Sequence, residues 1–276
     1  MNFLSKKIVV VFSMKKFLCI WMLLCSVVYA EGEPMKVMRD TTTPPDFSRV
    51  PALYGKVSKA NTPLVDHVKK SIQLASQEKG KLSPQVLQID GMTSTKGRYL
   101  LNHLCSFPDT VYLEVGSWKG SSLVSALYQN KALRKAYAVE KWVRYADNGF
   151  DFGDVREEFR SNVRSCLDGL PLTVHERDCF SVNVKEIPEK ITLYFYDGEH
   201  REEDQKMAFT YFNDRLASEF IAVVDDWNWE CCRKGTFAAF DELGYQVLFE
   251  QYLPANHDAD TANWWNGMYV AVIRKK

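Results

Sequence analysis

The sequence lacks an excess of charge of either sign, because its 276 residues include 35 basic and 35 acidic side chains. Recognition of a nucleic-acid backbone needs a basic surface, so the composition gives no support to a DNA or RNA partner. The sequence also lacks an internal repeat, which excludes a repeat architecture. What remains is the composition of an ordinary globular protein, with 46% apolar and 25% charged residues.

The seven cysteines lack the CxxC spacing of a metal site or a redox motif. Cys19 and Cys25 lie in an apolar N-terminal run, and the other five are scattered over the rest of the chain. An odd and scattered set fits small core side chains better than a disulfide framework. The adjacent pair Cys231–Cys232 leaves a redox pair as an alternative, although neighbouring cysteines seldom reach disulfide geometry.

The N-terminus has the pattern of a signal peptide. A basic pair, Lys15-Lys16, precedes an apolar run over residues 17–24, which is too short to span a bilayer. The small residues Val28 and Ala30 then stand where a signal peptidase cuts. We therefore expect residues 1–30 to be a signal peptide.

Export to the periplasm or the medium would follow, and no stable membrane span would remain after cleavage. Met14 is an alternative start, since residues 1–13 hold a second basic pair and apolar run of their own. An uncleaved membrane anchor, or a buried helix in a cytoplasmic protein, is the alternative to export.

Residues 31–84 are expected to form a linker and one helix before the main domain, 85–276. Prolines among polar residues over 31–61 are typical of a linker. Thr62-Pro63 forms a favourable helix start, and an apolar stripe at helical spacing runs from there to Ala75.

Apolar strands then alternate with helices, which predicts an α/β fold. The expected strands are 111–115, 136–139, 172–176, 191–196, 220–224, 245–250 and 268–273. The expected helices are 94–105, 121–127, 155–167, 202–216 and 232–243. The last two strands have no helical pattern between them and should pair antiparallel. We therefore predict a Rossmann-like, seven-stranded, mostly parallel sheet with an antiparallel last strand, helices on both faces and an N-terminal helical extension.

A glycine turn follows the first of these strands. Glu114 lies near the end of the strand, and Gly116 and Gly120 bound the turn into the next helix. Glycines let a ligand approach the backbone, and a helix start favours anionic groups. A dinucleotide enzyme would show GxGxxG, whereas the middle glycine is replaced here by Trp118. An acid two residues before the first glycine suits a cofactor with a cationic amino group and no phosphates.

Two further acids end the next two strands. Glu140 is placed to hold ribose hydroxyls, as in nucleotide-binding folds. Asp178 is placed to accept the adenine amino group. A solvated strand end is the alternative for Glu140.

In their order and content these segments resemble the class I methyltransferases, which use S-adenosylmethionine. The residues that carry the resemblance are Glu114–Gly120, Glu140–Trp142, Asp178–Phe180, Asp197–His200 and Val223–Trp227. Within that class they resemble bacterial small-molecule O-methyltransferases, including the sugar-modifying ones. The resemblance covers about residues 90–275.

The resemblance implies a binding site for S-adenosylmethionine built from Glu114, Gly116, Gly120, Glu140 and Asp178.

The resemblance also implies that Asp197, Asp225 and Asp226 bind a divalent metal. The strand pattern supports this, because the two strand ends should lie about 4.8 Å apart in the sheet. Converging carboxylates repel each other unless a cation lies between them. Oxygen ligands favour magnesium, manganese or calcium over zinc, and we expect magnesium. The alternative for the aspartate pair is an N-cap of the helix near Trp229.

The implied reaction is O-methylation of a small hydroxylated molecule. The metal would lower the pKa of the substrate hydroxyl, and Asp197 or His200 would accept its proton. A surface position is the alternative for His200. Two loops, 142–153 and 253–266, carry aromatic residues that suit the walls of a substrate site or the packing of strand ends. A non-catalytic, exported Rossmann-like binding module is the alternative function.

Overall fold

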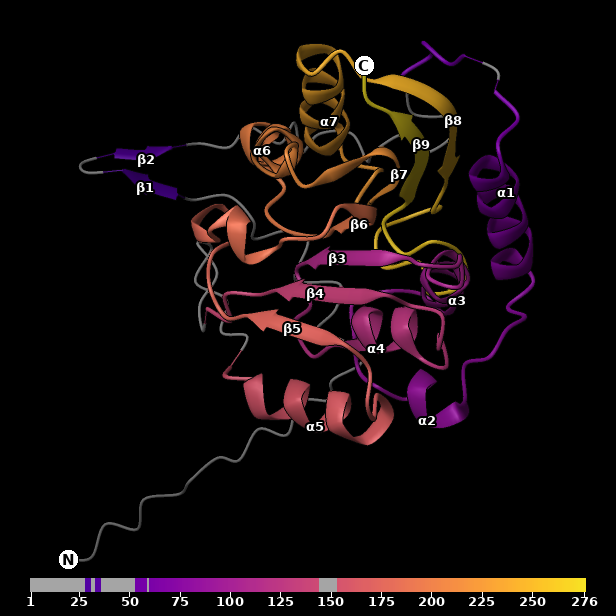
Figure 1. Cartoon of the computed structure of the whole chain (residues 1–276). Helices are drawn as coiled ribbons and strands as arrows, with labels where there is room; N and C mark the ends of the chain where they lie inside the picture. Colours follow the sequence, from indigo (N-terminus) through magenta and orange to yellow (C-terminus); the bar gives the residue numbers. More distant parts are fainter. Residues whose placement is uncertain (1–27, 31–32, 36–52, 59, 144–152) are drawn as a thin grey trace, which may run out of the picture. The chain divides into compact units, whose positions relative to one another are not determined.

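The computed structural model describes residues 28–30, 33–35, 53–58, 60–143 and 153–276 (Figure 1). Most of the predicted signal peptide, with Cys19 and Cys25, lies outside the described residues. So do most of the predicted linker and the centre of the aromatic loop, with Tyr145, Phe150 and Phe152. In the part of the chain that is described, helices are too short or too polar to cross a membrane.

Two short strands near the N-terminus form a unit of their own. β1 (Val28–Ala30) and β2 (Glu33–Met35) pair antiparallel, with Val28 opposite Met35.

The main unit is built on a seven-stranded sheet in the order β5-β4-β3-β6-β7-β9-β8 (Figure 1). The strands are β3 Val111–Val115, β4 Lys135–Val139, β5 Leu172–His175, β6 Ile191–Tyr196, β7 Leu216–Val224, β8 Gln246–Leu253 and β9 Met268–Arg274. Six of these seven strands run parallel, and β9 is antiparallel to both of its neighbours, β7 and β8. The predicted mostly parallel sheet with an antiparallel last strand is confirmed.

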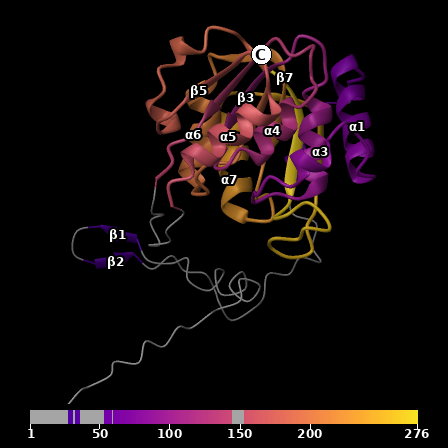
Figure 2. The same ribbon diagram turned by 90° about the horizontal axis from the view of Figure 1, so that it is seen from below.

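Helices cover both faces of the sheet, as predicted (Figures 1 and 2). One apolar cluster joins the sheet to α1–α5, and a second joins the other face to α6 and α7. The helices are α1 Pro63–Ser76, α2 Pro84–Leu87, α3 Thr95–Leu104, α4 Ser121–Leu127, α5 Arg156–Cys166, α6 Glu202–Phe212 and α7 Glu230–Glu242. Two 3-10 turns, Cys179–Ser181 and Val184–Glu186, follow β5.

Two boundaries differ from the prediction by four residues. The helix expected over 202–216 ends at Phe212, and β7 begins at Leu216 rather than at residue 220. The first residues of β7 do not form a continuous apolar run, because Ser218 interrupts it and is exposed. The sequence therefore gives no clear strand signal before residue 220. The four-residue helix α2 is too short to show a helical period. The five cysteines in the described chain are free thiols, Cys231 and Cys232 among them.

The N-terminal helix and the segment before it cover one end of the sheet. Thr62 caps α1 by accepting a hydrogen bond from Val65 N, and α1 packs beside α3 (Figure 2). The segment 53–58, which we call the strap, runs along β8, the edge strand. Ser58 N donates to Val247 O at 2.9 Å.

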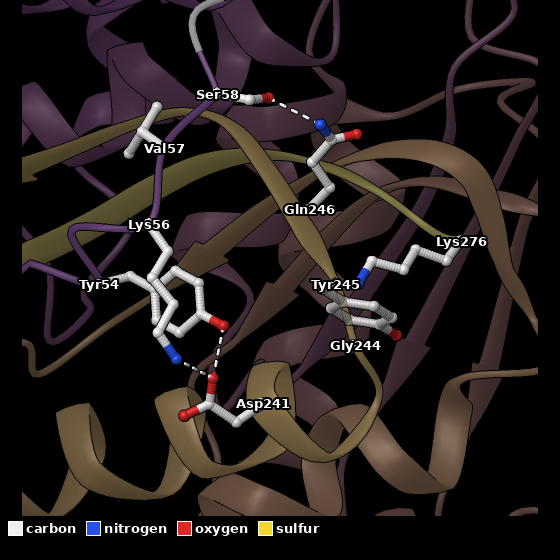
Figure 3. A pocket seen from close by; sticks show the side chains of 9 residues that line it. All are labelled: Tyr54, Lys56, Val57, Ser58, Asp241, Gly244, Tyr245, Gln246 and Lys276. Atoms are coloured by element: carbon white, nitrogen blue, oxygen red, sulfur yellow. Dashed lines mark hydrogen bonds and ion pairs between the residues drawn. The ribbon is translucent and has the colours of Figure 1, made fainter.

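Side chains fasten the strap at two further points. The Glu250 carboxylate accepts hydrogen bonds from Tyr54 N at 3.0 Å and from Gly55 N at 2.9 Å. Tyr54 and Lys56 both form hydrogen bonds with Asp241 near the end of α7, and all three line a surface pocket that includes no predicted site residue (Figure 3). The strap therefore pairs or shields part of an edge that would otherwise be open to other chains.

Candidate active site

The predicted site residues gather at the carboxyl edge of the sheet, where its winding reverses. The helix after β3, α4, packs on one face of the sheet, and the helix after β6, α6, packs on the other. β3 and β6 are neighbours, so a topological switch point lies between them. Glu114 lies near the end of β3, and Asp197 directly follows β6. Ligands of open α/β sheets bind at such points.

The turn from Gly116 to Gly120 depends on both glycines. Gly116 has φ +86° and Gly120 has φ +84°, and Trp118 between them is also left-handed at +42°. A Cβ on Gly116 would lie 1.9 Å from the backbone oxygen of Asp197, and one on Gly120 would lie 3.0 Å from the ring of Phe159. The turn therefore lies directly against the chain that leaves β6.

Glu140 joins this turn from the end of β4. Its carboxylate accepts hydrogen bonds from three backbone amides: Ser117 N at 2.9 Å, Trp118 N at 2.8 Å and Trp142 N at 2.9 Å. The predicted ribose-binding acid thus lies beside the predicted glycine turn, and the amides hold its carboxylate in one orientation. A fixed carboxylate loses little freedom when it binds a ligand.

Glu114 is fully buried, which is unusual for a carboxyl group. It accepts hydrogen bonds from Tyr112 Oη at 2.5 Å and Ser122 Oγ at 2.9 Å. Burial, with a contribution from the charge of Glu140, raises the pKa of Glu114 to about 7, although the hydroxyls oppose the rise. A buried carboxyl of this kind gains from a cationic ligand. Tyr112 and Ser122 were not predicted as site residues, although Tyr112 shares a strand face with Glu114.

Asp178 stands apart from the other predicted cofactor residues. It follows β5, its side chain is exposed, and its carboxylate caps a 3-10 turn by accepting from Phe180 N at 2.9 Å. It lies at the same edge of the sheet as Glu140, because β5 is the neighbour of β4.

Three aspartates meet where β6 and β7 end. The strands are paired up to Tyr196 and Val224, and Asp225 N donates to Tyr196 O at 3.1 Å. Burial and the charges of Asp225 and Asp226 raise the pKa of Asp197 well above its ordinary value. Burial and the charge of Asp226 do the same to the pKa of Asp225. Within the described chain, Asp225 Oδ1 is buried and accepts no hydrogen bond.

His200 completes this cluster. Its Nε2 lies 2.6 Å from Asp226 Oδ2, and single ligand atoms of Asp197, His200 and Asp226 all lie within 4.8 Å of one another. Partial burial lowers the pKa of His200, but the ion pair with Asp226 outweighs it and the pKa is raised. The predicted metal set contained Asp225 in place of His200, which was predicted as a base. The structure brings the three aspartates and His200 to one edge of the sheet, and the imidazole of His200 is one of the groups that could bind a metal ion.

The aspartate pair does not cap α7. Trp229 is the N-cap residue, and no side chain accepts a hydrogen bond there. The capping alternative is therefore wrong. Asp226 has φ +53° and is 5% exposed, a strained and buried position for a carboxylate.

The chemistry of the donors fits a hard cation. The carboxylates have raised pKa values, and one of their oxygens, Asp225 Oδ1, has no hydrogen-bond partner in the described chain. A divalent ion would stabilise their charged form by offsetting the repulsion between them. The glycine turn, Glu114 and Glu140 fit a cofactor with an amino group and a ribose.

The predicted wall over 253–266 is a packed structure rather than an open aromatic surface. Trp264 is 6% exposed and belongs to the apolar core, and Asp260 accepts hydrogen bonds from within the loop. Trp264 is therefore a packing residue, which was the alternative for these aromatics.

The main unit is similar to known methyltransferases in sequence and in fold. Residues 113–227 match the model of a methyltransferase domain family. The O-methyltransferase TomG from Streptomyces achromogenes, solved with S-adenosylmethionine, has a TM-score of 0.50 at 12% identity and covers 78% of this chain and 100% of its own. An O-methyltransferase from Bacillus cereus, solved with S-adenosylhomocysteine, has a TM-score of 0.46 at 12% identity and covers 78% and 92%. No curated protein matches the sequence.

The family match over residues 113–227 and the Rossmann-like methyltransferase fold of the main unit agree with the resemblance to the class I S-adenosylmethionine-dependent methyltransferases.

Proposed function

We propose that the domain transfers the methyl group of S-adenosylmethionine to a hydroxyl oxygen of a small molecule, beside a bound divalent cation. The observation that carries the proposal is the contact between the Gly116 turn and Asp197, since it brings the cofactor side and the acidic cluster to one point. TomG and the Bacillus cereus enzyme are named as O-methyltransferases, which agrees with an oxygen acceptor.

The cofactor would be held by the residues of the first three strands. Glu140 would bind the ribose hydroxyls from its fixed position, Glu114 would face the amino group, and Asp178 would accept from the adenine amine. The Gly116–Gly120 turn would let the cofactor approach the backbone. Asp178 would either give up its hydrogen bond from Phe180 N or keep that bond and accept a second one from the ligand, because a carboxylate has two oxygens.

The cation would be held by Asp197 and Asp226, with Asp225 or His200 as a further ligand, and magnesium fits these donors best. When bound, it supplies Lewis-acid chemistry that lowers the pKa of a substrate hydroxyl. In the transfer the substrate oxygen bonds to the methyl carbon while the carbon–sulfur bond breaks, leaving S-adenosylhomocysteine. Asp197, or His200 in its neutral form, would accept the hydroxyl proton, and the contact of His200 Nε2 with Asp226 Oδ2 would orient the imidazole for that task.

Calorimetry with S-adenosylhomocysteine tests the cofactor site, on protein that begins at Glu31, with and without magnesium. Glu140→Ala should weaken binding by about 1.5–3 kcal/mol, the value of hydrogen bonds to a charged group. Glu242→Ala is the matched control, because Glu242 pairs with Lys206 at the far end of α7. Unchanged affinity in the Glu140 variant would refute the ribose assignment.

A non-catalytic binding module is the second candidate, and the signal-peptide pattern is what favours it. Export would remove the domain from cytoplasmic S-adenosylmethionine. A radioactive methyl-transfer assay over hydroxylated acceptors separates the two candidates, because a binding module would retain cofactor affinity and show no transfer.

A further inference from the structure

The loop between β8 and β9, residues 254–267, is organised around one buried carboxylate. Asp260 is 3% exposed and accepts hydrogen bonds from Asn256 N at 3.0 Å, Ala262 N at 3.1 Å and Asn263 Nδ2 at 2.8 Å. The loop is thus tied together by its own polar groups, and it can hold a side chain in a set position.

This loop is joined to the segment that carries Asp226. Trp227 N donates to Gly267 O, and Asn228 N donates to Asn266 O, both at 2.9 Å. Trp229 Nε1 donates to Asp258 Oδ1 at 3.1 Å, and the ring of Trp229 packs edge-on against His200, with centroids 4.8 Å apart. The loop therefore adjoins both members of the His200–Asp226 pair.

The side chain of Asn266 makes the direct contact with Asp226. Its Nδ2 donates to Asp226 Oδ1 at 2.6 Å, while its Oδ1 accepts from Ala259 N at 2.7 Å. Because Ala259 occupies the amide oxygen, the amide nitrogen must face Asp226. The orientation of this amide is thus fixed by the backbone of the loop.

This contact decides which carboxylate oxygen of Asp226 faces the acidic cluster. Oδ1 is occupied by Asn266, which leaves Oδ2 directed to His200. The backbone of Asp226 is left-handed, a conformation that the surrounding contacts must maintain.

We propose that Asn266 is a positioning residue for the cation site: it holds Asp226 so that Oδ2 faces His200, within the cluster of Asp197, His200 and Asp226. This inference rests on the proposed function, since it concerns the same carboxylate. Asn266 would not touch the substrate or the cation. Its removal should weaken cation binding while the cofactor site, on the first three strands, keeps its affinity.

The test compares Asn266→Ala with Asn263→Ala. Asn263 is an asparagine of the same loop, but its side chain donates to Asp260 and not to Asp226. Manganese binding is measured by calorimetry and electron paramagnetic resonance, and S-adenosylhomocysteine binding by calorimetry. Asn266→Ala should bind manganese about tenfold more weakly. This is the lower end of the loss in metal affinity that follows when a metal ligand loses its hydrogen-bond partner. Asn263→Ala should bind it within about twofold of wild type, and both should keep their cofactor affinity. Asn266→Leu, which fills the volume of the amide, replaces the alanine variant if that variant does not fold.

Three results would overturn the inference alone: unchanged manganese affinity in the Asn266 variant, an equal loss in the Asn263 variant, or a parallel loss of cofactor affinity. If wild-type protein bound S-adenosylhomocysteine but no manganese, the cation in the proposed function would be refuted as well. Those outcomes are distinguishable, because wild-type binding is measured first.

Discussion

Gly116 and Asp197 are in contact through their backbones: a Cβ on Gly116 would lie 1.9 Å from Asp197 O and 2.6 Å from its carbonyl carbon. The contact is possible because Gly116 has no side chain and adopts a φ of +86°. A change at this position would therefore move the first residue of the acidic cluster as well as the glycine turn.

Gly116→Ala should lower the free energy of unfolding by more than about 3 kcal/mol, since backbone strain adds to a clash with main-chain atoms. Gly169→Ala is the matched control, because Gly169 is also left-handed, at +69°, but has open space around its missing Cβ. The control should lose only about 1 kcal/mol. Urea denaturation of the three proteins measures both values, and equal losses would contradict the contact.

Binding of S-adenosylmethionine should weaken as the pH falls below 7. The pKa of Glu114 is raised to about 7, so the carboxyl becomes neutral below that pH and loses its attraction for a cationic amino group. Calorimetry from pH 5.5 to 8.5 measures the trend, and Glu114→Gln should remove it. A wild-type affinity that stays constant over this range would exclude Glu114 as the titrating group.

The same group should make the cofactor-free domain less stable as the pH rises. A folded-state pKa of about 7, against an ordinary value of 4.5, means that the folded protein holds this proton more tightly than the unfolded chain. The stabilisation is fully present below about pH 4.5 and is lost as the pH rises through 7. Glu114→Gln should therefore be more stable than wild type at pH 8, by about 3 kcal/mol at most. Thermal unfolding at pH 6 and pH 8 checks it.

Asp225→Asn should separate catalysis from stability. The substitution removes one buried charge while it keeps the shape, so repulsion within the cluster falls and the melting temperature should rise at pH 8. Methyl transfer should fall by about 100-fold with little change in cofactor affinity. Excess magnesium should restore part of the rate. Transfer that survives chelation in wild-type protein would argue against the cation.

Cleavage after Ala30 remains a prediction from the sequence. The Val28-x-Ala30 pattern predicts a mature chain that begins at Glu31 when the protein passes through a bacterial secretion system. Mass spectrometry of the N-terminus measures it. A mature chain that still carries residues 14–30 would indicate an anchor or a cytoplasmic protein instead.

Much of the fold was predictable because its strands are short, buried and separated by turn residues. β3 and β6 begin and end where the apolar runs do, at Val111–Val115 and Ile191–Tyr196. The start of β7 was missed because Ser218 interrupts the apolar pattern, and pairing with β6 and β9, rather than local sequence, makes it a strand.

Site residues that directly follow a strand were predictable from the sequence. Site residues whose position depends on distant loops were not. Gly116, Glu140 and Asp197 follow directly from their strands. The place of His200 beside Asp226 depends on the left-handed backbone at Asp226, which no local pattern indicates. Asn266 lies 40 residues beyond Asp226, in a loop of mixed polar and aromatic residues whose fold depends on Asp260.

The strap over β8 sets where a stable fragment of this protein can begin. Glu250 binds the backbone of Tyr54 and Gly55, and α1 covers apolar side chains of α3 and the sheet. A fragment cut at residue 85 would expose a bare strand edge next to an uncovered apolar face, the combination that favours self-association. Expression designs should therefore start upstream of Leu53, so that the domain carries its own edge protection.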